Sequence, residues 1–212
     1  MKKTFDICSE TVDVSQMERI NQELEELLDA LYEKQVPSVR YTLEELTVFC
    51  STLITQQRDG TLAELEGAWC LQANPYQPRM PQDAQIDFIH KTTYLAVSIL
   101  AYVEQKYPEV ADTIVGYREA LQKGMRFAAK TKMVGHTYEE AYWLEQFIGY
   151  FEKGEVLAYL VTNPEFCPQL YTLLSSIHQE MDVLLQEQTY YDGFGNNQEE
   201  RIKVISQKLV RL

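Results

Sequence analysis

The segment that decides the fold is NPEFCPQLYTLLSSIHQEMDVLLQEQ, residues 163–188. Its large apolar residues recur three or four positions apart, at Leu170, Leu173, Ile177, Met181 and Leu184. This spacing places them on one face of an α-helix and does not fit the alternation of a β-strand. Asn163 followed by Pro164 is typical of an N-cap with proline in the first turn. The segment therefore predicts a long amphipathic helix that ends near Gln188.

The same periodicity covers most of the chain. It predicts helices at about 15–31, 43–57, 61–74, 83–106, 108–130, 137–154, 155–161 and 198–212 as well. Four S/T-x-x-E signals, which are typical of helix starts, occur at Ser15–Glu18, Thr42–Glu45, Thr61–Glu64 and Thr137–Glu140. We therefore expect an all-α protein of eight or nine helices, arranged as an irregular bundle or a short array of antiparallel helix pairs.

Two local features qualify this architecture. Gln56–Gly60 reads QQRDG and is similar to the Q-x-x-D-G turns of α/α-toroid repeats, although Leu62 stands where those repeats carry tryptophan. A partial α/α-toroid-like arrangement is therefore the alternative fold. The length of 212 residues indicates a single domain, residues 1–212. Three prolines within residues 75–82 cannot remain helical and mark a candidate internal boundary.

The charge and hydropathy of the chain exclude some classes of partner. The formal net charge is −13, which repels nucleic-acid phosphates and anionic lipids over most of the surface. No apolar run approaches the roughly 18 residues that a membrane span needs. The two lysines near the start precede no apolar segment, so we expect no signal peptide. These observations predict a cytoplasmic protein that binds neither nucleic acid nor membranes.

The four cysteines do not form a recognisable pattern. Cys8, Cys50, Cys70 and Cys167 are scattered and include no CxxC pair, so neither a disulfide framework nor a zinc site is indicated. Cys50 shares a helical face with Leu46 and Leu53, which predicts a reduced, buried thiol. We expect no cofactor.

Aromatic residues are concentrated between positions 138 and 194. Twelve of them fall within this interval, which is about twice the average density of the chain. Tyrosine and tryptophan are favoured in binding surfaces. The leading hypothesis is therefore a non-enzymatic interaction protein with an aromatic-rich surface around 138–151 and 190–194, made by Tyr142, Trp143, Tyr191 and Phe194 together with His136, Glu139 and Asp192. Burial of these residues in the core is the alternative.

A second hypothesis is a small hydrolase or another ligand-modifying enzyme. His136 lies just before a helix start and could form an acid–base pair with Glu139, in a pocket that Tyr191 and Asp192 would complete. Asp83, Asp87 and His90 recur at helical spacing and form a weak candidate for a metal site. The alternative assignment gives the two aspartates to the helix start and His90 to the edge of the apolar stripe.

Two further surfaces could bind a partner. Lys123, Arg126 and Lys130 form a positive stripe that would suit an acidic partner or an anionic ligand, or else is an ordinary solvated face. Homodimerisation through the helix of residues 164–188 or the last helix is a third possibility.

The segment TYYDGFGNNQEERIKV, residues 189–204, contains the densest glycine and asparagine. It lacks the third glycine of a dinucleotide-binding loop and the glycine and glutamate of a calcium loop. It fits a connector in which Gly193 and Gly195 end one helix and Asn197 caps the next.

Overall fold

The structure is a computed structural model, and it describes residues 14–33, 42–59, 65–69, 82–130, 148–153, 155–186, 197 and 199–210. Every regular element among these residues is helical, and they include no β-strand, which confirms the all-α prediction. The helices with defined bounds are α1 (Val14–Tyr32), α2 (Leu43–Thr55), α3 (Gln82–Lys106), α4 (Pro108–Thr113), α5 (Tyr117–Lys130), α7 (Val156–Thr162), α8 (Cys167–Gln186) and α9 (Glu199–Val210). Residues 148–153 are helical too.

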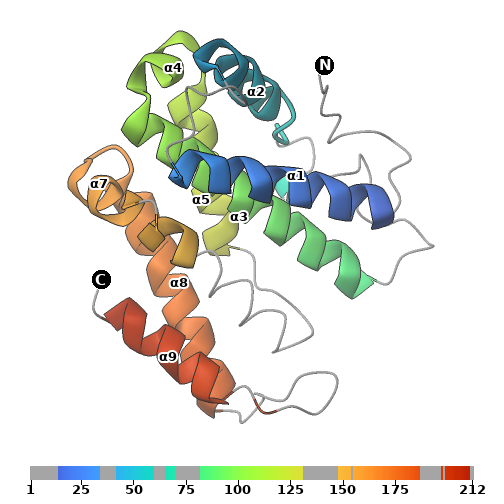
Figure 1. The fold of residues 1–212 in the computed structure, drawn as a ribbon. Coiled ribbons are helices and arrows are strands. Elements are labelled where there is room, and N and C mark those ends of the chain that lie inside the picture. Colours follow the sequence, from blue (N-terminus) through green and yellow to red (C-terminus); the bar gives the residue numbers. More distant parts are fainter. Residues whose placement is uncertain are drawn as a thin grey trace.

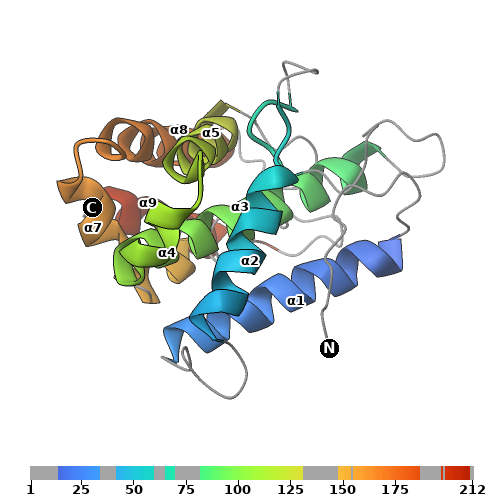
Figure 2. The same cartoon turned by 90° about the horizontal axis from the view of Figure 1, so that it is seen from above.

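Helix α3 is the centre of the molecule. Every residue from Thr92 to Glu104 is buried, so this part of the helix is covered on all sides. It packs against α1 on one side and α5 on another, with α4 and α7 near its C-terminal end. The packing then continues outward from α5 to α8 and from α8 to α9 (Figure 1). Figure 2 shows α5 and α8 side by side in the second view. The arrangement is an irregular bundle.

Trp69 joins three helices in the core. Its side chain is fully buried, and its indole Nε1 donates to the Leu53 carbonyl oxygen of α2 at 2.7 Å. Its ring lies so close to α5 that a Cβ at Gly124 would come within 2.7 Å of Trp69 Cζ3 and of Val97 Cγ2 on α3. The tryptophan is therefore an anchor of the segment that follows α2.

Gln57 and Gly67 fix the same segment to α5. The side-chain amide nitrogen Nε2 of Gln57 donates to the carbonyl oxygens of Gly67, at 3.0 Å, and Ala120, at 2.8 Å. Gly67 has a φ of +89°, and a Cβ there would lie 2.3 Å from the Lys123 carbonyl oxygen. The predicted helix at 61–74 is therefore wrong over residues 65–69, because the left-handed backbone at Gly67 interrupts it.

The helix starts were predicted with different success. Thr42 and Glu45 form the complete predicted capping box of α2. Asn163 and Asn197 each accept, through Oδ1, from the backbone N–H two residues later, at the starts that lead into α8 and α9. In contrast, α1 begins at Val14, so Ser15 lies inside it. The Thr61 and Thr137 signals and the glycines of residues 189–196 lie outside the described residues.

The prediction of one helix from Pro108 to Lys130 was wrong, because it is two helices. Pro108 does occupy the first turn of α4, as expected. However, α4 ends at Thr113, and α5 begins only at Tyr117, after Gly116 with a φ of +80°. A residue with positive φ cannot continue a right-handed helix. The candidate domain boundary at 75–82 lies outside the described residues except for Gln82, where α3 begins.

The described residues include the thiol of Cys50 and the helices whose hydropathy bears on membrane crossing. Cys50 is fully buried and free, between Leu46 and Leu53 on the buried face of α2, as predicted. Burial raises the pKa of its thiol to about 12, so the thiol stays protonated at neutral pH. Among the helices that the structure describes, none has the length and hydropathy needed to cross a membrane.

Candidate functional site

Two polar clusters meet the C-terminal end of α3. One is centred on the buried carboxylate of Glu104, and the other contains the side chains of Tyr32, Tyr102 and Tyr107. Their residues on α3, Tyr102 and Glu104, are two positions apart and so point to different sides of the same helix end, where α1, α4, α7 and residues 148–153 come close to α3.

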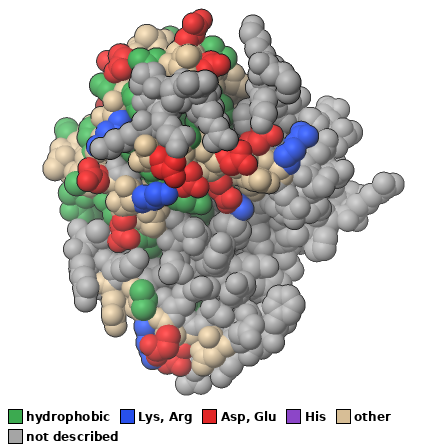
Figure 3. Space-filling model, in the orientation of Figure 1, with side chains coloured by type: hydrophobic (Ala, Val, Ile, Leu, Met, Phe, Trp, Pro, Cys, Tyr) green, Lys and Arg blue, Asp and Glu red, His purple; other side chains and the backbone are tan. Residues whose placement is uncertain are grey.

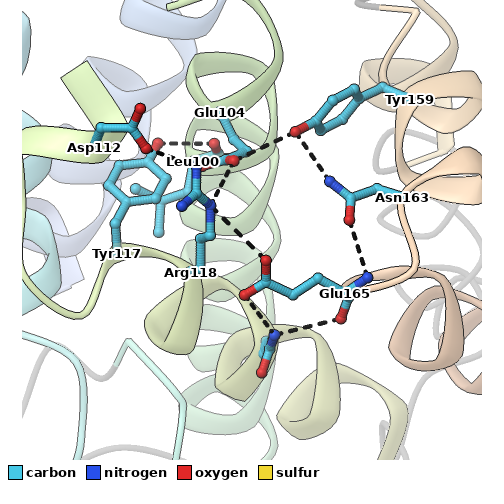
Figure 4. Close-up of polar contacts among 9 residues, drawn as sticks. Leu100, Glu104, Asp112, Tyr117, Arg118, Tyr159, Asn163 and Glu165 are labelled. Carbon is cyan, nitrogen blue, oxygen red and sulfur yellow. Dashed lines mark hydrogen bonds and ion pairs between the residues drawn. The ribbon is translucent and has the colours of Figure 1, made fainter. Parts of the chain in front are cut away.

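Glu104 and Arg118 form the centre of the first cluster (Figure 4). The Glu104 side chain is only 2% exposed, and its Oε1 lies 2.8 Å from Arg118 Nε on α5. Arg118 also donates from Nη2 to Asp112 Oδ1 of α4, at 2.8 Å. Its hydrogen bond to Glu104 is the main reason why the pKa of Arg118 is raised. One guanidinium group therefore joins α3, α4 and α5.

Helix α7 and the turn between α7 and α8 complete this cluster. The Tyr159 hydroxyl donates to Glu104 Oε1 at 3.3 Å, and Asn163 Nδ2 lies 3.2 Å from the same hydroxyl. Glu165 approaches Arg118 Nε at 3.9 Å and accepts from Gln122 Nε2 at 3.3 Å. Among the described residues, Glu104 Oε2 has no hydrogen-bond partner. Removing Arg118 would leave the buried Glu104 carboxylate without its ion-pair partner, so the four helices that meet here depend on Arg118.

The three tyrosines of the second cluster are held in fixed positions. The ring centroids of Tyr32 and Tyr102 are 5.0 Å apart at an interplanar angle of 73°, and Tyr107 lies 6.4 Å from Tyr102. The Tyr32 hydroxyl donates to the Tyr150 carbonyl oxygen at 2.6 Å, and the Tyr102 hydroxyl donates to the Leu31 carbonyl oxygen at 3.0 Å. Burial is the main cause that raises the pKa of Tyr32. Both hydroxyls are thus used internally.

Tyr150, whose carbonyl oxygen accepts from Tyr32, adjoins these three tyrosines and is half-buried, as are Tyr32 and Tyr107, whereas Tyr102 is buried. We call Tyr32, Tyr102, Tyr107 and Tyr150 the tyrosine cluster. Lys153 extends over Tyr32, with its Nζ 5.4 Å from the ring centroid, and pairs with Asp29 at 2.9 Å. The tyrosine cluster therefore has an apolar, partly accessible surface with an ammonium group at its edge.

The surface around this cluster is acidic. Figure 3 shows that carboxylates dominate the charged side chains on the described part of the face that α1 crosses. Asp29 on α1 and Glu33 directly after it are exposed, as are Glu152 and Glu155 beyond Tyr150. This local charge agrees in sign with the net charge of the whole chain.

A third arrangement, between α8 and α9, contains a serine, a histidine and an aspartate. Ser206 Oγ lies 3.5 Å from His178 Nε2, and His178 Nδ1 lies 3.4 Å from Asp182 Oδ2. Ser206 is inside α9, where the backbone N–H groups bond within the helix and are not free to stabilise an oxyanion. We interpret this arrangement as a polar contact that holds α9 on α8.

Most of the predicted aromatic surface lies outside the described residues. This applies to His136, Glu139, Tyr142, Trp143, Tyr191, Asp192 and Phe194. The described end of the 138–151 segment contains Tyr150, half-buried in the tyrosine cluster, and Phe151, which is buried in the core. The segment thus contributes to both the core and the tyrosine cluster at this end.

The predicted positive stripe lies on α5, but its charge is partly neutralised. Lys123 pairs with Glu119 at 2.8 Å, and this hydrogen bond, with a smaller effect of Arg126, lowers the pKa of Glu119. Arg126 is half-buried, and the side chain of Lys130 lies outside the described residues.

The weak metal candidate cannot be assembled from the described side chains. Asp83, Asp87 and His90 all lie on α3, as predicted, but only the backbone of this part of the helix is described. Among the side chains that the structure describes, no three His, Cys, Asp or Glu residues are grouped as metal ligands.

Sequence reasoning missed both clusters at the end of α3. The signal for Glu104 was present, because it follows Leu100 by four positions and so falls within the apolar stripe of its helix. An isolated carboxylate in such a stripe requires a partner, but the sequence does not identify Arg118 as that partner. Tyr32 and Lys153 are 121 positions apart, and no local pattern connects them.

Comparisons with known proteins found no relative. No protein-family model, no curated protein sequence and no solved structure matches this chain.

Proposed function

We propose that the protein is a non-enzymatic helical interaction protein that binds a protein partner through an aromatic surface. The observation that carries this proposal is the tyrosine cluster, in which the half-buried ring of Tyr32 and the buried ring of Tyr102 are each held by a hydroxyl bond to the backbone. Rigid tyrosine rings offer a large contact area at a low cost in conformational entropy. Tyr150 connects the cluster to the aromatic-rich segment of residues 138–151.

In this proposal, Tyr142, Trp143, Tyr191 and Phe194 contribute to the same binding function as the tyrosine cluster. They come from the two parts of the sequence where aromatic residues are most dense. Tyrosine and tryptophan, together with arginine, are enriched among the side chains that dominate binding energy at protein interfaces.

We also propose a cytoplasmic location. Two cysteines are described, Cys50 and Cys167, and both are free thiols. Free thiols are typical of proteins from reducing compartments.

The test is a double substitution, Tyr142→Ala with Trp143→Ala, in the full chain. We expect the variant to unfold cooperatively, as the wild type does, but to lose a partner that copurifies with the wild type. Tyr171→Ala is the matched control, because Tyr171 is 51% exposed on α8 and lies in neither aromatic segment. Retention of the partner by the double variant, or loss of its cooperative unfolding, would contradict the proposal. The latter result would assign both residues to the core.

A further inference from the structure

Lys153 occupies a position that a side chain of another molecule could take. Its Nζ lies over the ring of Tyr32 and bonds to Asp29, and the side chains of Lys153 and Asp29 are 53% and 57% exposed. An ion pair this accessible to water contributes little to stability, so it can be exchanged at low cost. The ring below it does not have to move, because its hydroxyl is bonded to the Tyr150 carbonyl oxygen.

We propose that Tyr32 and Asp29 form a docking site for an arginine or lysine side chain of a basic protein segment, and that Lys153 fills this site in the unbound protein. This inference rests on the proposed interaction function and specifies the chemistry of the partner. The acidic residues Glu33 and Glu152 are exposed nearby, as is Glu155, which pairs with Lys106 at 3.7 Å, and the excess of carboxylates favours a partner of positive charge.

Arginine fits this site better than lysine. A guanidinium group can stack on an aromatic ring and donate two parallel hydrogen bonds to a carboxylate, whereas an ammonium group binds as a point charge. Asp29 precedes Tyr32 by three positions on α1, so its carboxylate and the ring lie on neighbouring positions of one helix face. An arriving arginine can therefore contact both groups at once and displace Lys153.

The test measures the binding of fluorescent peptides (Gly-Arg)5, (Gly-Lys)5 and (Gly-Glu)5 to the full chain by fluorescence anisotropy at one ionic strength. We expect the arginine peptide to bind most tightly and the glutamate peptide not to bind. Lys153→Gln removes the internal competitor, so affinity for the arginine peptide rises about two- to fivefold, which corresponds to one exposed cation–π contact. Asp29→Asn weakens binding.

Lys203→Gln is the matched control for net charge. Lys203 pairs with Glu199 and Glu200 on α9, so its loss makes the chain more negative without changing the Tyr32 surface. We expect the Lys203→Gln variant to bind the arginine peptide with the same affinity as the wild type. If both Lys153→Gln and Lys203→Gln raised the affinity for the arginine peptide equally, general attraction between opposite charges would explain the result and the proposal would be overturned. Weaker binding of this peptide after Lys153→Gln would also overturn it.

Substitutions of Tyr32 test the role of the ring. Tyr32→Phe keeps the ring face and is expected to keep the affinity, whereas Tyr32→Leu loses the gain that Lys153→Gln produces. Circular dichroism confirms that each variant is folded. If the wild type does not bind the arginine peptide, the docking site at Tyr32 and Asp29 is overturned. The proposed interaction function is not affected by that result, because it is tested separately by the copurifying partner and the Tyr142→Ala, Trp143→Ala variant.

Discussion

Close approaches between backbone and side chains depend on single residues in this protein. Gly124 and Gly67 are such positions. A methyl group at Gly124 would overlap Trp69 and Val97, and a methyl group at Gly67 would overlap the backbone of Lys123. The sequence contains nine glycines, and nothing in its local pattern separates these two from the others. Their importance follows from tertiary contacts with Trp69 and Lys123, which sequence periodicity does not describe.

Gly124→Ala is expected to destabilise the protein by about 1–3 kcal/mol, because the new methyl group overpacks against Trp69 and Val97. Urea denaturation measures this loss. Gly149→Ala is the control, since a Cβ there meets nothing within 4 Å and the residue is helical. We expect that change to be neutral or to stabilise by up to about 1 kcal/mol. Equal effects of the two substitutions would show that the contact at Gly124 relaxes freely.

At the scale of the helix, local signals predicted which segments are helical more reliably than where each helix ends. The start of α2 and the whole of α3 follow the sequence pattern closely, because caps and apolar stripes act within a few residues. The division between α4 and α5 was missed, because Ile114 and Val115 continue an apolar pattern that the backbone at Gly116 interrupts. The sequence does not identify Glu104 and Arg118 as a pair, because they meet only where this turn places α5 against α3.

Thr42→Ala is expected to destabilise α2, and with it the protein, by about 1 kcal/mol. The hydroxyl of Thr42 accepts from the Glu45 backbone N–H at 3.1 Å, and the Glu45 carboxylate accepts from the Thr42 backbone N–H at 2.8 Å. The midpoint of thermal or urea unfolding reports the change.

Thr52→Ala provides the comparison within the same helix. The Thr52 hydroxyl bonds to the Val48 carbonyl oxygen inside the helix and caps nothing. Because alanine has the higher helix propensity, we expect this variant to be as stable as the wild type or slightly more stable. If Thr42→Ala behaved in the same way, the capping box would not contribute to stability.

The whole molecule buries several weak acids in one core, and this determines its behaviour in alkaline solution. Burial raises the pKa of Cys50 from its ordinary 9.0 to about 12, and it also raises the pKa values of Tyr32 and Tyr117 above 10.0. In the unfolded chain these groups lose their protons at the ordinary values. Above pH 9 the unfolded chain therefore binds fewer protons than the folded protein, and stability falls as the pH rises.

We expect the free energy of unfolding to be insensitive to Cys50 below pH 9. Above pH 9, the titration of Cys50 lowers the free energy of unfolding by up to about 1.4 kcal/mol per pH unit, until the pH passes the pKa of this thiol in the folded protein. Urea denaturation at pH 8, 9.5 and 10.5 measures the slope, and Cys50→Ala reduces it. Ser98→Ala, which changes a buried, non-titrating residue of similar size on α3, leaves the slope unchanged. A constant stability from pH 8 to 10.5 would contradict this account.

The order in which the helices pack has a consequence for how the chain folds. Along the succession α1, α3, α5, α8 and α9, only the last two helices follow each other directly in the sequence. The three other interfaces of this succession each close a loop that contains at least one further helix, and the bond from Tyr32 to Tyr150 spans 118 positions. Loop closure costs entropy before the contact that rewards it can form. We therefore expect folding to be slower than in an up-and-down bundle of the same length, with α3 acquiring its complete environment only in the late stages.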